Sequence, residues 1–325
     1  MGIILSYAAN VVATAITHAM KQRFKRRAIG FARRTGIVLL NLLFNHRLFY
    51  RTLGWLNERF DFLASVFVAY PASAKYAKRY FAPSTNSKFA WSPALCALLH
   101  QNGKWTLGFG ISSLEQDLRD SSNEENLRAL IERTEHIRKA VGADHKTFSG
   151  ILPGVLHRRG ILEDATEAKV TARVVLKAIR LVEQKENLPS DVPLIVLGGR
   201  GYIGSRLVQA LPEQRLHSVD KSRSDDTWPT HLKGQRALLI NVASRTALQQ
   251  YLGRVWSGLA LLNEVYPEPK PQEIEAFTQH GNSAYHVIGL KASAYPKFPK
   301  AYAGGIPCCA GRPTDDIEPL ILKLN

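Results

Sequence analysis

The sequence predicts an α/β protein with a C-terminal doubly wound Rossmann domain, an α/β substrate lobe before it, and a basic, apolar, helical N-terminal segment. Three observations predict this class. Beyond residue 190, short apolar runs alternate with helical patterns, which is typical of a parallel sheet with helical crossovers. A glycine-rich turn joins the first of these runs to its helix. More than half of the net charge of +16 lies in the first 60 residues. The predicted boundaries are 1–60, 61–190 and 191–325.

The composition excludes several classes of protein. With 325 residues, of which 45% are hydrophobic and 22% charged, the chain is too apolar to be disordered. Three cysteines cannot form a disulfide framework and provide no CxxC pair for zinc, so we expect no metal site. This cysteine usage indicates a reducing compartment, and we expect a cytoplasmic protein.

The N-terminal segment raises the question of a membrane. Residues 1–60 contain ten basic residues and one acidic residue, Glu58. Residues 1–20 carry no formal charge and are followed by the basic run 21–27, which is the reverse of the order in a signal peptide. About 20 residues could just span a bilayer, but the polar side chains in this stretch favour a location at the surface.

The second apolar run, residues 37–44, is about half as long as a membrane span and has arginines on both sides. This composition suits a helix that lies on an anionic membrane surface. The alternative is that the run covers an apolar face of the protein or of a partner subunit, which leaves a homo-oligomer open. We expect no nucleic acid partner, because the basic residues alternate with Leu, Ile and Phe and no known binding motif accompanies them.

The remaining elements follow from periodicity, caps and turns. In the substrate lobe we expect strands at 62–70 and 148–152, a hairpin at 94–111 around Asn102-Gly103, and helices at 124–141 and 166–186. In the Rossmann domain we expect strands at 194–197, 216–219, 237–242, 259–262 and 285–288, and helices at 202–211, at 246–252 and from Pro271.

The strongest functional motif is G-x-G-x-x-G, between an apolar strand and a helix. It comprises Gly199, Arg200, Gly201, Tyr202, Ile203 and Gly204. We expect Gly199 to make the tight turn, Gly201 to let a pyrophosphate approach, and Gly204 to let the helix pack on the strand, with the phosphate at the helix N-terminus. The motif predicts an NAD or NADP site. The alternative is a glycine-rich turn that binds no nucleotide.

Residues after the next strands extend this site. Asp220 follows its strand about 20 residues after the first glycine, where a carboxylate can bind the ribose hydroxyls of NAD. Lys221, Ser222 and Arg223 come next, and this cluster could instead take the 2′-phosphate of NADP. Asn241 and Ser244 are candidates for the nicotinamide end. Alternatively, they are ordinary turn and N-cap residues.

The glycine motif looks like that of the extended short-chain dehydrogenases, but the only Tyr-x-x-x-Lys match, at 266–270, contains two prolines that forbid the helix which that pair needs. With 149–154, Thr171-Ala172, 242–244, 262–267 and Gly304-Gly305, the chain distantly resembles the aldehyde-forming long-chain acyl-carrier-protein reductases. These belong to the two-lobed class of shikimate dehydrogenase-like and methylenetetrahydrofolate dehydrogenase-like enzymes. The resemblance implies NADPH, a fatty acyl thioester substrate, an acyl carrier protein partner and a covalent cysteine.

The candidates for catalysis are four residues. Cys308 and Cys309 follow Gly304-Gly305, and a thiolate there could accept an acyl group; the alternative is a pair of small buried residues. Lys169 could polarise a carbonyl and His286 could act as a general acid, although a solvated lysine and a satisfied core histidine are the alternatives. We therefore expect an NAD(P)-dependent oxidoreductase for a lipophilic carbonyl or acyl thioester. The alternative is a non-catalytic Rossmann-like subunit that docks through its N-terminus.

Overall fold

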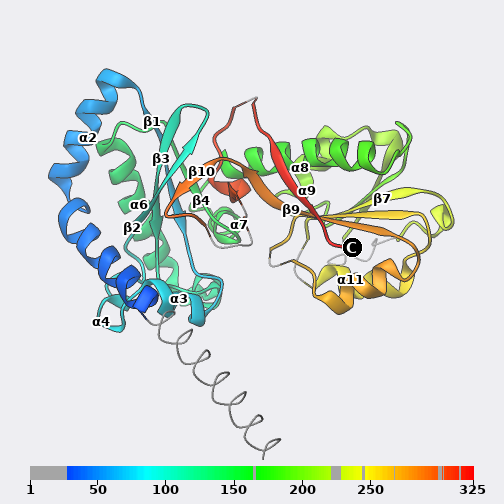
Figure 1. Ribbon diagram of the computed structural model, residues 1–325, viewed down its shortest axis with the longest axis horizontal. Helices are drawn as coiled ribbons and strands as arrows, with labels where there is room; N and C mark the ends of the chain where they lie inside the picture. The colour runs from blue at the N-terminus through cyan, green and yellow to red at the C-terminus, as the bar shows by residue number, and fades with distance from the viewer. Residues whose placement is uncertain are drawn as a thin grey trace, which may run out of the picture.

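The structure, a computed structural model, contains two sheets that lie side by side, with helices on their faces (Figure 1). It describes residues 28–163, 166–220, 228–243, 246–266, 268–298, 302, 304–314 and 316–325. The predicted membrane-facing residues 1–27 therefore lie outside the described residues. A long helix, α8 (Thr166–Lys185), connects the first lobe to the second sheet. The predicted α/β class is confirmed.

The first sheet has the order β10-β2-β3-β1-β4. Its strands are β1 (Leu63–Ala69), β2 (Ala94–Gln101), β3 (Lys104–Gly110), β4 (His145–Phe148) and β10 (Ser293–Tyr295). β1 runs parallel to β3 and β4, so the carboxyl ends of β1 and β4 lie at the same edge. The predicted hairpin is confirmed: Asn102 and Gly103, with φ of 49° and 75°, take the positive φ values that a type I′ turn requires.

The helices of this lobe are helix 28–44, α2 (Arg47–Phe60), α3 (Ala74–Tyr80), α4 (Pro83–Asn86), α5 (Glu115–Arg119), α6 (Glu124–Ala140) and α7 (Leu152–Arg158). The strand expected at 148–152 is wrong. β4 ends at Phe148, because Gly150 has a φ of 57° and Pro153 occupies the first turn of α7. Proline is favoured at that position of a helix, where its missing N–H has no intrahelical role.

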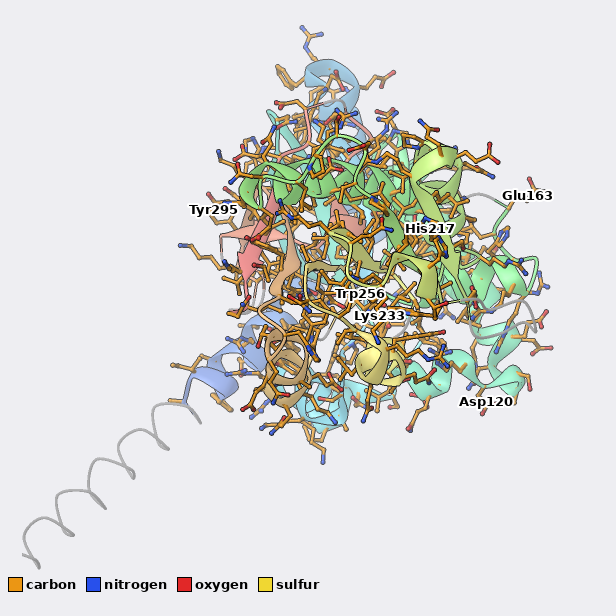
Figure 2. The ribbon with its side chains drawn as sticks, turned by 90° about the vertical axis from the view of Figure 1, so that its right-hand side faces the viewer. Asp120, Glu163, His217, Lys233, Trp256 and Tyr295 are labelled. Carbon is orange, nitrogen blue, oxygen red and sulfur yellow. The ribbon has the colours of Figure 1, made fainter. Side chains whose placement is uncertain are left out.

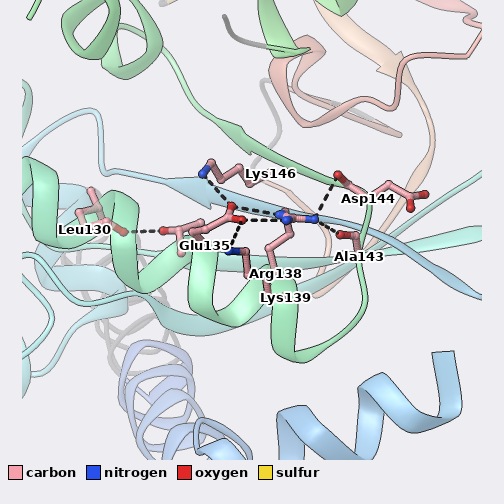
Figure 3. Close-up of polar contacts among 8 residues, drawn as sticks. Leu130, Glu135, Arg138, Lys139, Ala143, Asp144 and Lys146 are labelled. Atoms are coloured by element: carbon pink, nitrogen blue, oxygen red, sulfur yellow. Dashed lines mark hydrogen bonds and ion pairs between the residues drawn. The ribbon is translucent and has the colours of Figure 1, made fainter. Parts of the chain in front are cut away.

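A cluster of charges fixes β4 to α6 (Figure 3). The carboxylate of Glu135 on α6 accepts hydrogen bonds from Arg138 at 2.7 Å and from Lys146 of β4 at 2.8 Å. These hydrogen bonds, that of Arg138 first, lower the pKa of Glu135 to about 2. Arg138 also donates to the carbonyl of Ala143, just before β4. The cluster therefore positions the strand whose carboxyl end reaches the second lobe.

The second sheet has the order β11-β9-β8-β7-β5-β6, and β12 pairs with β9. Its strands are β5 (Leu194–Leu197), β6 (Leu216–Val219), β7 (Ala237–Asn241), β8 (Leu259–Asn263), β9 (Ser283–Lys291), β11 (Gly305–Ile306) and β12 (Pro319–Lys323). The five strands from β5 to β9 are parallel, and their order across the sheet is β6-β5-β7-β8-β9. Numbered along the chain from β5, this order is 2-1-3-4-5. This is a doubly wound order, in which ligands bind where the order reverses, at the carboxyl ends of β5 and β7.

The elements around this sheet are α8, α9 (Gly204–Ala210), α10 (Ala247–Tyr251) and α11 (Pro271–Thr278), with short 3-10 turns that include η6 (Cys308–Ala310). After β9 the chain returns to the first lobe, since β10 pairs with β2. Tyr295 of β10 lies at the margin of the molecule (Figure 2). Part of the predicted domain 191–325 thus belongs to the first sheet. In the part of the chain that the structure describes, no helix is long and apolar enough to cross a membrane.

Candidate functional site

The glycine-rich turn is packed so tightly that side chains are excluded at two of its positions. A Cβ on Gly199 would overlap Ser218 Oγ of β6, and a Cβ on Gly204 would overlap the carbonyl oxygen of Gly198. The N–H of Gly201 donates to the same oxygen at 2.9 Å, and a Cβ there would lie only 3.0 Å from it. The close packing expected at Gly204 is present.

The structure corrects the position of the tight turn. Gly198 has a φ of 85°, which is the left-handed conformation that glycine adopts without strain, whereas Gly199 has no positive φ. A Cβ on Gly198 would also lie 2.5 Å from Ala243 Cα, directly after β7. The turn therefore depends on the glycine before the motif. The segments after β5 and β7 approach closely there because Gly198 has no side chain and Ala243 has only a methyl group.

The side chains of the turn reach toward the first lobe. The ring of Tyr202 lies 5.2 Å, between centroids, from that of His157 on α7, and the guanidinium of Arg206 lies 4.6 Å from the Tyr202 ring centroid. Ile203 packs against the main core, while Arg200 is exposed. The glycine turn and α7 thus border the same space between the lobes.

The residues expected at the ribose and the nicotinamide are placed in part. Asp220 is half-buried and directly follows β6. The glycine turn lies beside this strand end, because the N–H of Gly198 donates to Val219 O at 2.8 Å. Arg223 and Ser244 lie outside the described residues.

Asn241 belongs to a buried polar row that crosses the ends of β7 and β8 and the middle of β9. Asn241, Asn263 and His286 are neighbours in register on β7, β8 and β9. Asn241 Nδ2 donates to Asn263 Oδ1 at 2.8 Å, and its Oδ1 accepts from the N–H of Ala243 at 3.3 Å. Asn263 Nδ2 donates to Val265 O at 2.8 Å, and lies 3.0 Å from His286 Nδ1. The row joins the strand ends and shapes the loops that follow them.

This row bears on two expected roles. Asn241 is only 1% exposed and uses both ends of its amide inside the protein, which favours the alternative of a structural residue, while a cofactor contact stays a prediction. His286 is 3% exposed, and burial lowers its pKa, which disfavours the charged imidazolium that a general acid would use. Lys169 lies exposed in the first turn of α8, beside the buried Glu167.

The cysteines lie between the lobes but are not activated. Cys308 is buried and Cys309 half-buried, and η6 packs between α8 and β4. Burial first, with Glu167 and Glu264 adding to it, raises the pKa of Cys309 to about 12, and burial likewise raises that of Cys308. A thiolate nucleophile needs a lowered pKa. The geometry therefore favours the interpretation of small buried residues.

The residue that the sequence reasoning missed is Glu264. It follows β8 directly, and its N–H donates to Asn241 O of β7 at 3.0 Å. The glycine turn follows β5, on the other side of β7, so Glu264 lies two strand spacings, or about 10 Å, from that turn. Its carboxyl makes no hydrogen bond or ion pair with the described residues, and burial raises its pKa to about 8. A carboxylic acid that holds its proton near neutral pH can act as an acid or a base.

The first lobe completes the surroundings of Glu264. Tyr70, directly after β1, accepts a hydrogen bond from the N–H of Ile151 at 3.1 Å, and its backbone N–H lies 3.3 Å from Ser149 Oγ. Electrostatic interactions link Cys309 to both Tyr70 and Glu264. The carboxyl ends of both sheets therefore face one inter-lobe site. The sequence signal was available, because Glu264 directly follows a buried strand.

The raised pKa of Glu264 predicts a pH-dependent stability. The folded protein keeps a proton that the unfolded chain releases near pH 4.5, so the unfolding free energy should fall from about pH 4.5 to 8, by at most about 1.4 kcal/mol per pH unit. Glu264→Gln should remove this slope and be more stable than the wild type at pH 8. Urea denaturation across this pH range measures the effect. Glu268 is exposed, so Glu268→Gln is the control and should keep the pH dependence of the wild type. If Glu264→Gln also keeps that pH dependence, the raised pKa does not belong to Glu264.

Comparisons with known proteins add distant neighbours. No family model matches the chain, and no curated protein sequence matches it. The bifunctional enzyme FolD, a methylenetetrahydrofolate dehydrogenase/cyclohydrolase from Campylobacter jejuni, is 13% identical, with 73% of this chain and 85% of that chain covered. Hetero-hexameric glutamate dehydrogenase from Thermus thermophilus is 14% identical, with 76% and 67% covered.

Both structures align with a TM-score of 0.34. A similarity of this size carries no argument, so the fold class rests on the strand order of this chain. Neither structure is an acyl-carrier-protein reductase, and that resemblance stays a prediction.

Proposed function

We propose that the protein is an NAD(P)-dependent oxidoreductase that acts on a lipophilic carbonyl between its two lobes. One observation carries the proposal: the turn 198–204, with glycine at 198, 199, 201 and 204, lies at the point where the strand order reverses, and Asp220 follows the adjacent strand. A Cβ at Gly199 would overlap Ser218 Oγ and one at Gly204 would overlap the carbonyl oxygen of Gly198, so this close-packed turn requires glycine at both positions. Doubly wound domains bind dinucleotides with such a turn.

The residues divide the work as follows. Residues 198–204 would hold the pyrophosphate and Asp220 the adenosine ribose, while the bound nicotinamide supplies or accepts a hydride. When a carbonyl is reduced, the hydride adds to its carbon and the Glu264 carboxyl donates a proton to its oxygen. In the reverse direction the Glu264 carboxylate accepts the alcohol proton. In each direction the hydride and the proton together account for the two hydrogens exchanged with the substrate, so no further oxidant or reductant is needed.

The lipophilic substrate is supported by the aromatic side chains near Glu264. The Tyr302 ring centroid lies 5.5 Å from that of Tyr266 and 5.6 Å from that of Phe298. A fatty acyl thioester, delivered by an acyl carrier protein, is the finer proposal. The raised pKa values of Cys308 and Cys309 disfavour a covalent step, so hydride would reach the thioester carbonyl directly and the carrier thiol would leave. Full activity in Cys308→Ala and Cys309→Ala is the expected result.

Titration of the purified protein with NADH and NADPH, followed by nucleotide fluorescence, tests the proposal. We expect saturable binding of at least one of them, and an Asp220→Ala variant that binds NADH at least tenfold more weakly, by about 1.4 kcal/mol. Asp191→Ala, at an exposed position before β5, is the matched control. If neither nucleotide binds saturably, the protein is instead a Rossmann-like subunit without a cofactor, and the enzyme proposal is wrong.

A further inference from the structure

Helix 28–44 turns an apolar side to solvent, although Ile37 and Leu40 on its other side pack on the protein. The positions exposed to solvent carry no formal charge and, apart from Thr35, no polar side chain: they are Ala28, Ile29, Phe31, Ala32, Thr35, Gly36, Leu39, Leu42, Leu43 and Phe44. Phe31 and Leu42 are each 66% exposed. An ordinary surface helix turns its polar side to water and its apolar side to the core. We call these ten positions the outer face.

The polar residues of the helix point the other way, into the protein. Asn41 Nδ2 donates to Leu95 O of β2 at 2.9 Å, and Asn41 Oδ1 accepts from the N–H of Leu95 at 2.8 Å. Arg34 donates to the carbonyl of Lys78, and the guanidinium of Arg33 lies 5.0 Å from the ring centroid of Tyr80. These contacts fix the rotation of the helix about its axis, so the apolar face cannot turn inward.

The charges around the outer face have one sign. On α2, the next helix along the chain, Arg47, Arg51 and Arg59 are exposed, and Glu58 is the only acidic residue between 28 and 60. Exposed apolar side chains accompany these arginines, and Leu48 is 72% exposed. Directly before the helix, the sequence 21–27 contains five basic residues and no acidic one.

We propose that the outer face of helix 28–44 docks on an anionic phospholipid surface, with the arginines of α2 against the lipid phosphates. An interfacial helix needs an apolar side that sinks about 5–10 Å into the headgroup region and basic groups beside it. Each basic residue near such a surface contributes to attraction over about a Debye length. The outer face and its neighbours supply both.

A second copy of the chain fits this face less well. Seventeen helical residues are about 25 Å long, and with a width of about 10 Å they offer a few hundred Å², against about 800 Å² for each partner in a stable interface. Protein interfaces also carry about one hydrogen bond per 100–200 Å², whereas the outer face offers only Thr35. The clustered arginines of two copies would also repel each other.

Co-sedimentation of the full-length protein with lipid vesicles tests the proposal. We expect binding to vesicles that contain phosphatidylglycerol, at least tenfold weaker binding to pure phosphatidylcholine, and a loss of at least tenfold in the double variant Leu42→Glu/Leu43→Glu. Leu322→Glu, at a 50% exposed position on β12, is the matched control and should bind as the wild type does. Arg47→Glu/Arg51→Glu should weaken binding to the anionic vesicles alone. Circular dichroism and urea midpoints establish that the variants are folded.

Three results would overturn the proposal. If Leu42→Glu/Leu43→Glu binds anionic vesicles as the wild type does, other residues carry the attachment. If neither protein binds vesicles, and sedimentation equilibrium shows a wild-type dimer that the double variant lacks, the face joins two copies. If neither dimer nor vesicle binding occurs, lipid is not the occupant. None of these measurements involves NADH or NADPH, so they stand apart from the test of the proposed function.

Discussion

Gly204→Ala should weaken the binding of both NADH and NADPH about a hundredfold, or about 2.7 kcal/mol. The new methyl group would overlap the carbonyl oxygen of Gly198, and this backbone atom cannot turn away as the end of a side chain could. The turn would have to open, which would change the backbone of the segment that we propose binds the pyrophosphate. Fluorescence titration of both nucleotides measures the loss.

The matched control for this variant is Gly253→Ala. A Cβ at Gly253 meets no atom within 4 Å, so the substitution should leave nucleotide affinity unchanged. Gly204 is the first residue of α9, and alanine has a higher helix propensity than glycine. Helix propensity alone would therefore make Gly204→Ala more stable, so it could not explain a loss of nucleotide affinity in that variant. Wild-type affinity in Gly204→Ala would show that the turn does not hold a dinucleotide.

The second large effect is expected at the buried polar row. Asn263→Leu should lower the unfolding free energy by about 3 kcal/mol, because it leaves the Asn241 amide and the carbonyl of Val265 without their partners inside the protein. Each unsatisfied buried group costs about 1–3 kcal/mol. Urea denaturation at fixed pH measures the change. Since the row shapes the loops after β7 and β8, substrate turnover should fall as well.

An exposed asparagine provides the control for this prediction. Asn126→Leu on α6 removes only one side-chain hydrogen bond, to Asn123, and should change stability by less than about 0.5 kcal/mol. A loss of similar size in both variants would mean that the row contributes nothing particular. Full stability in Asn263→Leu would show that the side-chain hydrogen bonds of the row add nothing to the stability that the backbone ladder and apolar packing provide.

Much of the fold could be predicted because its signals are local. The turn Asn102-Gly103 selects a hairpin by its own backbone preferences, and the boundaries of the second-lobe strands differ from expectation by a few residues. The strand expected after Phe148 failed, since its apolar residues Ile151 and Leu152 read equally well as the start of a helix. The pairing of β10 with β2, over almost 200 residues, leaves no trace in a local pattern.

The candidate site could be predicted only on its nucleotide side. The glycine spacing indicates a close-packed turn, but the positive φ lies at Gly198, before the motif, and its contact is with Ala243, which lies 45 positions later. The expected acid, His286, is a core residue because its strand β9 lies between β8 and β12, with Asn263 and Leu322 as its partners in register. Glu264 is half-buried by surface exposure, and burial raises its pKa. Burial by distant segments sets a pKa, and residue order alone does not encode it.

The N-terminal charge shows the same division. The sequence by itself determined that basic and apolar residues concentrate before residue 60, that a glycine turn follows an apolar strand, and that strands alternate with helices. Only the tertiary structure decided which side of helix 28–44 meets water, because Leu95 and Lys78 take its polar groups and leave its apolar side chains outside. Periodicity acts over a few residues, whereas the orientation of a helix is fixed by the partners that its polar groups find across the fold.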